Sequence, residues 1–127
     1  MKHATVSIVI GVLFLAIGLL GFISNPIVGD SENVIFHADT THNIVHIASG
    51  ALFILFGVAF PASAGGFMMF FGIVYLALGV LGLITVGTAG TGKLLGFLHV
   101  NGADNILHIA LGVVIFMAAA IRSRSTT

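Results

Sequence analysis

The sequence is short of charge. Only 6% of its 127 residues are charged and its formal net charge is zero, whereas soluble domains carry about 25% charged residues. Such a chain cannot cover a water-exposed surface, and it offers no basic patch for nucleic acid. It also has no cysteine, which excludes disulfides, thiolate metal sites, iron–sulfur clusters and cysteine nucleophiles. These absences indicate an integral membrane protein whose first partner is the lipid bilayer.

Hydrophobic residues make up 58% of the chain. They form four runs long enough to cross a hydrocarbon core, which takes roughly 20 apolar residues. We predict helices at about 4–24, 41–60, 66–86 and 104–121. The expected fold class is therefore all-α, a single transmembrane domain over residues 1–127 built as a four-helix bundle. The connection at 61–66 is short, which predicts that the second and third helices are antiparallel neighbours.

The basic residues predict the orientation. Lys2 precedes the first helix, and Arg122 and Arg124 follow the last, while Lys93 is the one basic residue in the loops on the other side. The positive-inside rule then places both termini in the cytoplasm. We expect a multi-pass protein of the cell (inner or plasma) membrane, with the long loops and the histidine motifs toward the outer face.

The two halves of the chain are similar. GVLFLAIGLLGFI (11–23) and GIVYLALGVLGLI (72–84) agree at seven of thirteen positions, and HADTTHNIVHIASG (37–50) and HVNGADNILHIALG (99–112) agree at seven of fourteen. Chance matches among apolar residues do not align His, Asn and Gly in this way. We predict a tandem repeat, 4–60 and 66–121, whose parallel copies are related by a pseudo-twofold axis along the membrane normal. Because the first segment recurs as a membrane helix, we reject its interpretation as a signal peptide.

Small residues predict how the helices pack. Membrane helices associate through close backbone contact at glycine and other small residues, because lipid and leucine are equally apolar. Glycines seven residues apart share a helix face, and several recur in both halves. The predicted packing glycines are Gly11, Gly18, Gly50, Gly57, Gly72, Gly79 and Gly112.

Polar residues cluster where the second and fourth helices begin. Asp39 and Asn101 occupy matching positions and are favoured N-cap residues, and Asp104 suits the positive end of a helix dipole. Asn43 and His46 lie on one helix face with a packing glycine, as do Asn105 and His108. We expect these four side chains to point into the bundle and to form a polar lock through Asn–His hydrogen bonds between the repeats.

A ligand site is the alternative. His42, His46, Asp104 and His108 could meet near the axis as a three-histidine, one-carboxylate set for zinc, copper or iron. Against this, residue 42 lies about 100° around the helix from residue 43, so both do not point equally inward. His46 and His108 could instead bind a haem or a chlorophyll. We expect His37 and His99 to be interfacial anchors in the loops.

The H-N-x-x-H-x-x-x-G pattern at 42–50 and the N-x-x-D-N-x-L-H-x-x-x-G pattern at 101–112 carry a family resemblance. The chain resembles bacterial four-helix membrane proteins of the domain-of-unknown-function 4383 type. The resemblance implies four helices in a bacterial-type membrane and supplies no activity.

No catalytic motif is present: the sequence has no HExxH, no phosphate-binding glycine loop and no nucleophile beside a base. We therefore expect a small non-enzymatic membrane protein, an accessory or assembly-forming component that acts within the bilayer with other membrane proteins or as a homo-oligomer. No cofactor is predicted outright; the alternative is a protein that binds a metal ion, haem or chlorophyll through the repeated histidines.

Overall fold

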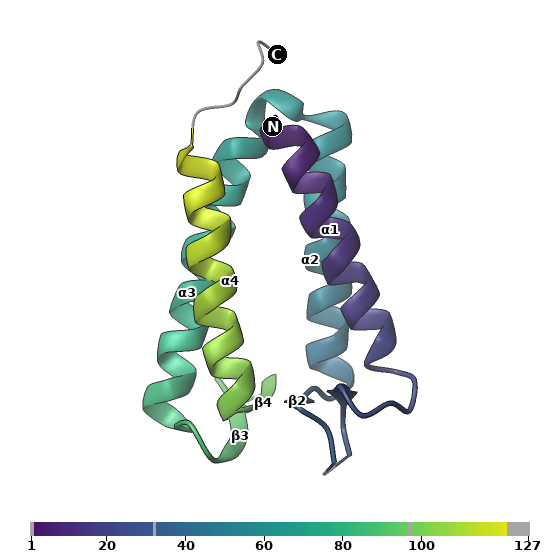
Figure 1. Ribbon diagram of the computed structural model, residues 1–127, viewed down its shortest axis with the longest axis vertical. Coiled ribbons are helices and arrows are strands. Elements are labelled where there is room, and N and C mark those ends of the chain that lie inside the picture. The colour runs from purple at the N-terminus through teal and green to yellow at the C-terminus, as the bar shows by residue number, and fades with distance from the viewer. Residues whose placement is uncertain (1, 32, 97, 122–127) are drawn as a thin grey trace.

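The computed structural model describes residues 2–31, 33–96 and 98–121. These residues form four long helices (Figure 1), which are α1 (His3–Leu20), α2 (Thr40–Ala59), α3 (Ala64–Thr85) and α4 (Gly102–Ala120). A single 3-10 turn, η1 (Pro61–Ser63), joins α2 to α3. Each helix is long and apolar enough to cross a membrane. The predicted all-α fold with four membrane-length helices is confirmed.

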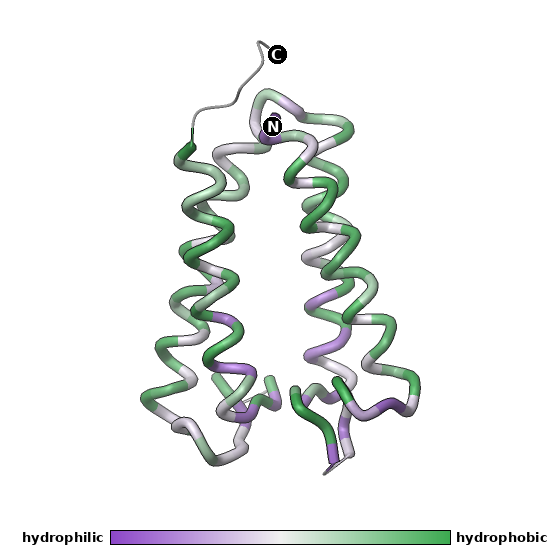
Figure 2. The backbone as a smooth tube through the Cα atoms, in the orientation of Figure 1, coloured by the Kyte–Doolittle hydropathy of each residue, from purple (hydrophilic) through white to green (hydrophobic). Residues whose placement is uncertain are grey.

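Hydrophobic side chains cover the outside of the bundle as well as its interior (Figure 2). Val58, Phe70 and Val114, from three different helices, are each more than half exposed. A soluble protein rarely exposes apolar surface of this extent, so the outer surface suits hydrocarbon. Polar residues gather at the end that carries the loops and strands, which is the lower end in Figure 2.

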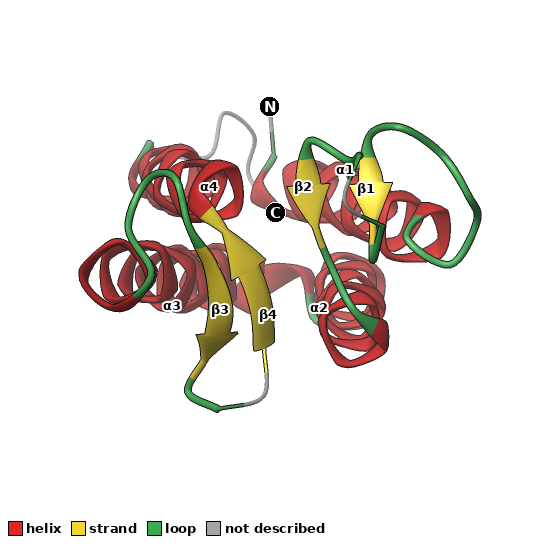
Figure 3. Ribbon diagram, turned by 90° about the horizontal axis from the view of Figure 1, so that it is seen from below, coloured by secondary structure: helices red, strands yellow, loops and turns green. Residues whose placement is uncertain are grey.

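The helices pack as two tight pairs, α1 with α2 and α3 with α4 (Figure 3). Glycines face each other within each pair. A methyl group built on Gly11 would lie 2.6 Å from the backbone oxygen of Gly50, and one on Gly112 would lie 2.7 Å from the backbone oxygen of Gly72. No side chain fits at these crossings, so glycine permits the close backbone approach.

The other predicted packing glycines also lie against the partner helix of their pair. A methyl group on Gly18 would lie 2.9 Å from the backbone oxygen of Asn43, one on Gly57 2.7 Å from that of Ala4, and one on Gly79 2.8 Å from that of Asn105. The predicted contact between α2 and α3 is smaller than expected. They run antiparallel on either side of η1, but each packs mainly against its own pair partner.

An aromatic core joins the two pairs. Its buried members are Phe14, Phe53, Met68, Tyr75, Ile115 and Ala119, which come from all four helices. The rings of Phe14 and Tyr75 meet edge to face with centroids 5.1 Å apart, a geometry that adds about 0.5–1.5 kcal/mol to the burial of the rings. The Tyr75 hydroxyl donates a hydrogen bond of 3.1 Å to the Ser49 hydroxyl. The buried phenol is thereby satisfied inside an apolar core.

The first helix ends earlier than predicted, at Leu20 instead of residue 24. The side chain of Asn25 accounts for this. Its Nδ2 lies 2.9 Å from the Leu20 carbonyl oxygen and its Oδ1 accepts from the Ile27 backbone N–H at 2.8 Å. An asparagine that bonds to nearby backbone in this way competes with the helix. The other helix boundaries lie one or two residues from the predicted ones.

The two long loops contain short strands that hydropathy did not predict. β1 (Val28–Gly29) pairs in parallel with β2 (Phe36–His37), and β3 (Thr91–Leu94) pairs antiparallel with β4 (Leu98–Asn101). Leu94, Leu98 and Val100 of this hairpin form a second buried cluster, which packs against Leu78 and Leu81 of α3. The strands lie across the end of the bundle (Figure 3), and they contain the two loop histidines, His37 in β2 and His99 in β4.

Candidate metal centre

The polar end of the bundle begins with two helix caps. The Asp39 carboxylate accepts from the backbone N–H of His42 at 3.0 Å. Asn101 and Asp104 form a capping box, in which each side chain accepts from the backbone N–H of the other at 2.9 and 2.8 Å. The Asp104 carboxylate also accepts from the backbone N–H of His37 at 3.0 Å. Asp104 therefore ties the first loop to the start of α4.

The two asparagines of the predicted lock face the other helix of their own pair. Asn43 packs against Gly21 at the end of α1, and Asn105 packs against Gly82 on α3. Asn105 Nδ2 donates to the carbonyl oxygen of Gly87 at 3.0 Å. Within the described residues, no hydrogen bond joins either asparagine to a histidine of the other half, and the Oδ1 atoms of both are buried without a partner. The Asn–His bond that we expected between the repeats is not formed.

Three histidines from two helices converge between the helix pairs. His42, His46 and His108 are only 2%, 7% and 3% exposed. Their ring centroids are 4.6 Å (42 to 46), 5.6 Å (42 to 108) and 6.2 Å (46 to 108) apart. One nitrogen from each ring lies within 4.8 Å of the other two. The sequence predicted four ligands at this point, and the structure brings together the three imidazoles without Asp104, whose carboxylate is used in the capping box.

The hydrogen bonds of these rings are incomplete. His42 Nδ1 lies 2.7 Å from the carbonyl oxygen of His99, so its N–H donates there and Nε2 keeps a free lone pair. His46 Nδ1 and His108 Nδ1 are buried and have no hydrogen-bond partner. A buried polar group without a partner costs about 1–3 kcal/mol. Three imidazoles with free nitrogens at one place are a donor set for a transition metal.

The surroundings of the three histidines favour a bare ion over a tetrapyrrole. Phe14 packs 5.9 Å from the His46 ring and Tyr75 packs 5.6 Å from the His108 ring, measured between centroids. The cavity beside His46 measures about 20 Å³, whereas pockets for organic ligands measure about 300–1,000 Å³. A haem or chlorophyll would need the helix pairs to separate.

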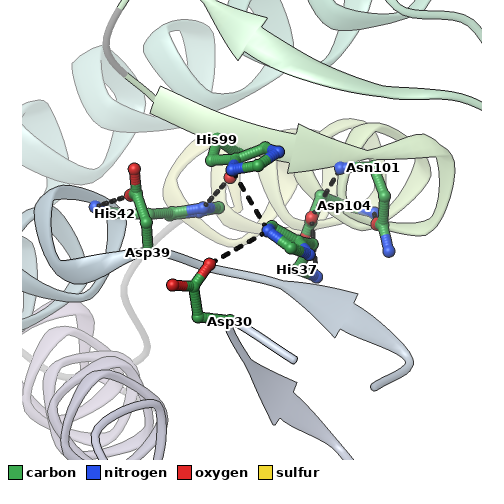
Figure 4. A network of polar contacts seen from close by, with 7 residues as sticks. All are labelled: Asp30, His37, Asp39, His42, His99, Asn101 and Asp104. Carbon is green, nitrogen blue, oxygen red and sulfur yellow. Dashed lines mark hydrogen bonds and ion pairs between the residues drawn. The ribbon is translucent and has the colours of Figure 1, made fainter. Parts of the chain in front are cut away.

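A second polar cluster lies in the loops directly outside the first (Figure 4). His37 Nε2 is 3.1 Å from His99 Nδ1 and 3.3 Å from an oxygen of Asp30, and the two rings have centroids 3.9 Å apart with their planes tilted by 52°. Partial burial, and then the neighbouring His37, hold the pKa of His99 below its usual range. A cleft of about 480 Å³ opens beside these residues.

Comparison with known proteins places the chain in a family. The model for the family described as domain of unknown function (DUF4383) matches residues 4–121, which is nearly the whole chain. The chain belongs to the DUF4383 family. No curated protein and no solved structure matches it. Membership in DUF4383 confirms the resemblance seen in the sequence and brings no activity with it, so the chemistry has to be inferred from the site.

The cluster of Asp30, His37 and His99 was not predicted. His37 and His99 were expected to be interfacial anchors, and no role was predicted for Asp30. One signal was available: the two histidines align in the two halves, and residues that align across a twofold axis meet if they lie close to it. Nothing in the sequence placed Asp30 beside them, because its position depends on the fold of the first loop.

Proposed function

We propose that this DUF4383 protein is a multi-pass membrane protein that holds a transition-metal ion, with Zn²⁺ as the reference case, between its two helix pairs. His42, His46 and His108 are the ligands. The observation that carries the proposal is the convergence of three buried imidazoles, two of which have a ring nitrogen with no other partner. Buried orphan nitrogens in an apolar setting are costly, and a bound metal would remove that cost for each nitrogen that it binds.

The donor set suits zinc. Zn²⁺ binds histidine nitrogen at about 2.0–2.1 Å in tetrahedral geometry, which sets neighbouring ligand nitrogens about 3.3 Å apart. The three nitrogens here are within 4.8 Å of one another, so small side-chain rotations suffice to bind the ion. Three protein ligands would leave the fourth position for a water molecule.

The neighbouring groups hold the histidines in an arrangement that suits a bound cation. His42 donates its Nδ1–H to a backbone carbonyl, the arrangement that fixes the tautomer and orientation of a metal-binding imidazole. The carboxylate of Asp104 is buried one helical turn before His108. It accepts from the backbone N–H groups of His37 and Asn101, so Asp104 fixes the first loop and the start of α4 without being a ligand.

Zinc binding tests this proposal. The purified protein in detergent is stripped with a chelator, titrated with Zn²⁺ and analysed for metal content. The His46→Ala variant should bind one zinc fewer per chain than wild type. His3→Ala is the matched control, because His3 lies at the opposite end of the bundle, where its Nε2 contacts the Ile121 carbonyl oxygen. Equal zinc contents in His46→Ala and wild type would overturn the proposal.

A second candidate is a purely structural role for the polar end. The packing of Asn43 on Gly21 and of Asn105 on Gly82 supports it, because both asparagines fix a helix pair at the same level. In this case the protein is a non-enzymatic accessory or assembly-forming component of the bilayer, acting with other membrane proteins or as a homo-oligomer. A preparation that takes up no zinc, and in which His46→Ala only lowers the unfolding temperature, would favour this candidate.

We further propose that the two halves arose by duplication and are related by an axis along the bundle. Aligned residues meet in pairs along this line: the ring centroids of Phe14 and Tyr75 are 5.1 Å apart, those of His46 and His108 6.2 Å, and those of His37 and His99 3.9 Å. Contacts between aligned residues are expected only close to a twofold axis. The order along the chain then gives two parallel repeats.

The orientation in a bacterial cell membrane is likewise proposed, with the termini in the cytoplasm and the histidines near the outer face. Lys2 supports it by the positive-inside rule; Arg122 and Arg124, on which the prediction also rests, lie outside the described residues. Ser31 is exposed in the first loop. A cysteine introduced by Ser31→Cys should react with an impermeant reagent on intact cells. Reaction only after lysis would reverse the orientation.

A further inference from the structure

The outer cluster has a hydrogen-bonding problem of its own. His37 Nε2 is within hydrogen-bond distance of both His99 Nδ1 and the Asp30 carboxylate. If Nε2 carries a hydrogen, it can donate fully to only one of these two acceptors. If Nε2 is a bare lone pair that accepts from His99, it faces a carboxylate oxygen that is also an acceptor. Either way, at least one of the two contacts of Nε2 is not a full hydrogen bond.

A metal ion resolves this arrangement, because it accepts all three lone pairs at once. Ligands of a tetrahedral zinc ion with bonds of about 2.0–2.1 Å lie about 3.3 Å apart. His37 Nε2 lies 3.1 Å from His99 Nδ1 and 3.3 Å from Asp30 Oδ1, and the ligand atoms of Asp30 and His99 are within 4.8 Å of each other. Two imidazoles and one carboxylate are also a donor set typical of zinc sites that keep an open position.

The surroundings leave the cluster accessible from the aqueous side. The Asp30 side chain is 72% exposed, whereas that of His37 is 13% exposed. The adjoining cleft of about 480 Å³ is lined by Ser31, Thr91 and Asn101 in addition to the three ligands. A hydrated ion can therefore reach the cluster and keep a water molecule in its fourth position.

His99 connects this cluster to the buried histidines. Its ring belongs to the outer cluster, while its carbonyl oxygen accepts from His42 Nδ1 at 2.7 Å. Figure 4 shows the His42 side chain beside His99, joined to it by this hydrogen bond. The two sets of ligands are thus neighbours along the bundle, one exposed and one buried.

We propose that Asp30, His37 and His99 form a second site for a divalent transition metal such as Zn²⁺, where the ion first binds from the loop side before it reaches the buried histidines. The site itself stands on its own geometry; only its role in supplying the buried ions rests on the proposed function. The partially exposed ligands make the outer site the faster to exchange.

Zinc stoichiometry in four forms of the full-length protein tests the outer site. Chelator-stripped wild type, Asp30→Asn, His46→Ala and the double variant are titrated with Zn²⁺ by calorimetry, and bound zinc is measured after desalting. We expect two equivalents in wild type, one in each single variant and none in the double variant. Asp30→Asn should weaken the outer site at least about 10-fold, since it removes the anionic ligand.

Matched controls keep the result specific. Ser31→Ala changes the same cleft without removing a ligand and should still bind two ions. His37→Gln should reproduce the loss seen in Asp30→Asn. Circular dichroism and thermal unfolding of each stripped variant show whether the fold is retained; Asp30 is exposed, so its replacement leaves the packed bundle untouched.

The outcomes separate the two proposals. A single equivalent in wild type that is lost in His46→Ala and kept in Asp30→Asn overturns the outer site and leaves the buried one. A single equivalent that is lost in Asp30→Asn and kept in His46→Ala overturns the proposed function and leaves the outer site. Two equivalents in wild type with slower filling of the buried site in Asp30→Asn support the supply role, and unchanged filling overturns that role.

Discussion

The α1–α2 and α3–α4 pairs are alike inside and differ where they face each other. Within each pair, glycine meets glycine at the crossing, and an asparagine packs against a glycine near the loop end. Between the pairs, His42 stands where the other half has Asp104, and Phe14 where it has Tyr75. The shared glycines and asparagines hold the helices together, and the exchange of His42 for Asp104 changes the number of ligands that each half supplies. The three-histidine site is asymmetric because one half supplies two ligands and the other half one.

The largest effect should come from breaking the shared contact. Gly50→Leu and Gly112→Leu each force a side chain against the backbone of the partner helix. We expect each variant to lose about 3 kcal/mol or more of stability, at the upper end of overpacking costs, in a thermal or denaturant unfolding series in detergent. Gly66→Leu is the control, because a methyl group there meets nothing within 4 Å. Unequal losses in the two pairs would show that the halves are not equivalent.

The next effect concerns the difference between His42 and Asp104. His42→Asp makes the first half resemble the second and removes one of the three imidazoles. The zinc affinity of the buried site should fall at least about 100-fold, because losing only a residue that hydrogen-bonds to a ligand already lowers metal affinity by about 10–100-fold. Asp104→Asn should retain the buried zinc, because Asp104 is not a ligand in this arrangement. Loss of the buried zinc in Asp104→Asn, with the fold intact, would return the carboxylate to the ligand set.

A smaller effect separates the two caps. Asp39 satisfies one backbone N–H, that of His42, whereas Asn101 bonds to Asp104 in both directions and also donates to the Ile35 carbonyl oxygen. Replacing a cap by alanine typically costs about 1 kcal/mol. Asp39→Ala should therefore cost about 1 kcal/mol, and Asn101→Ala about 0.5–1.5 kcal/mol more, because it also loses the bond to Ile35. Equal losses in an unfolding series would mean that the bond from Asn101 to the Ile35 carbonyl oxygen adds nothing to the cap.

Much of this comparison was visible in the sequence. Four apolar runs predicted the helices, because spanning length is a local property, and repeated glycines lie where the structure makes close contacts. The sequence analysis underestimated how well the His42 side chain points into the bundle. We took a helix face to have one inward side, but α2 has two neighbours, so Asn43 faces α1 while His42 faces the other pair.

The exact ligand set, the strands and the outer cluster could not be predicted, because they depend on contacts between residues far apart in the sequence. Asp104 was a plausible ligand by spacing, yet it lies three residues after Asn101, where a capping box forms and uses its carboxylate. The strands and the cluster of Asp30, His37 and His99 depend on how two loops fold against each other. Hydropathy carries no information about such contacts, and only the alignment of His37 with His99 hinted at one of them.

The smallest effect lies at the aromatic contact between the pairs. Tyr75→Phe gives both halves a phenylalanine and removes the hydrogen bond to Ser49, which should cost about 0.6 kcal/mol, the average for such bonds between membrane helices. Ser49→Ala should cost about the same, and the double variant no more than either single one, because both remove the same bond. Additive losses in this cycle would show that the bond contributes nothing to stability. The tyrosine would then act through ring packing alone, and the two halves would be equivalent at this level, leaving the exchange of His42 for Asp104 as the difference that matters for binding.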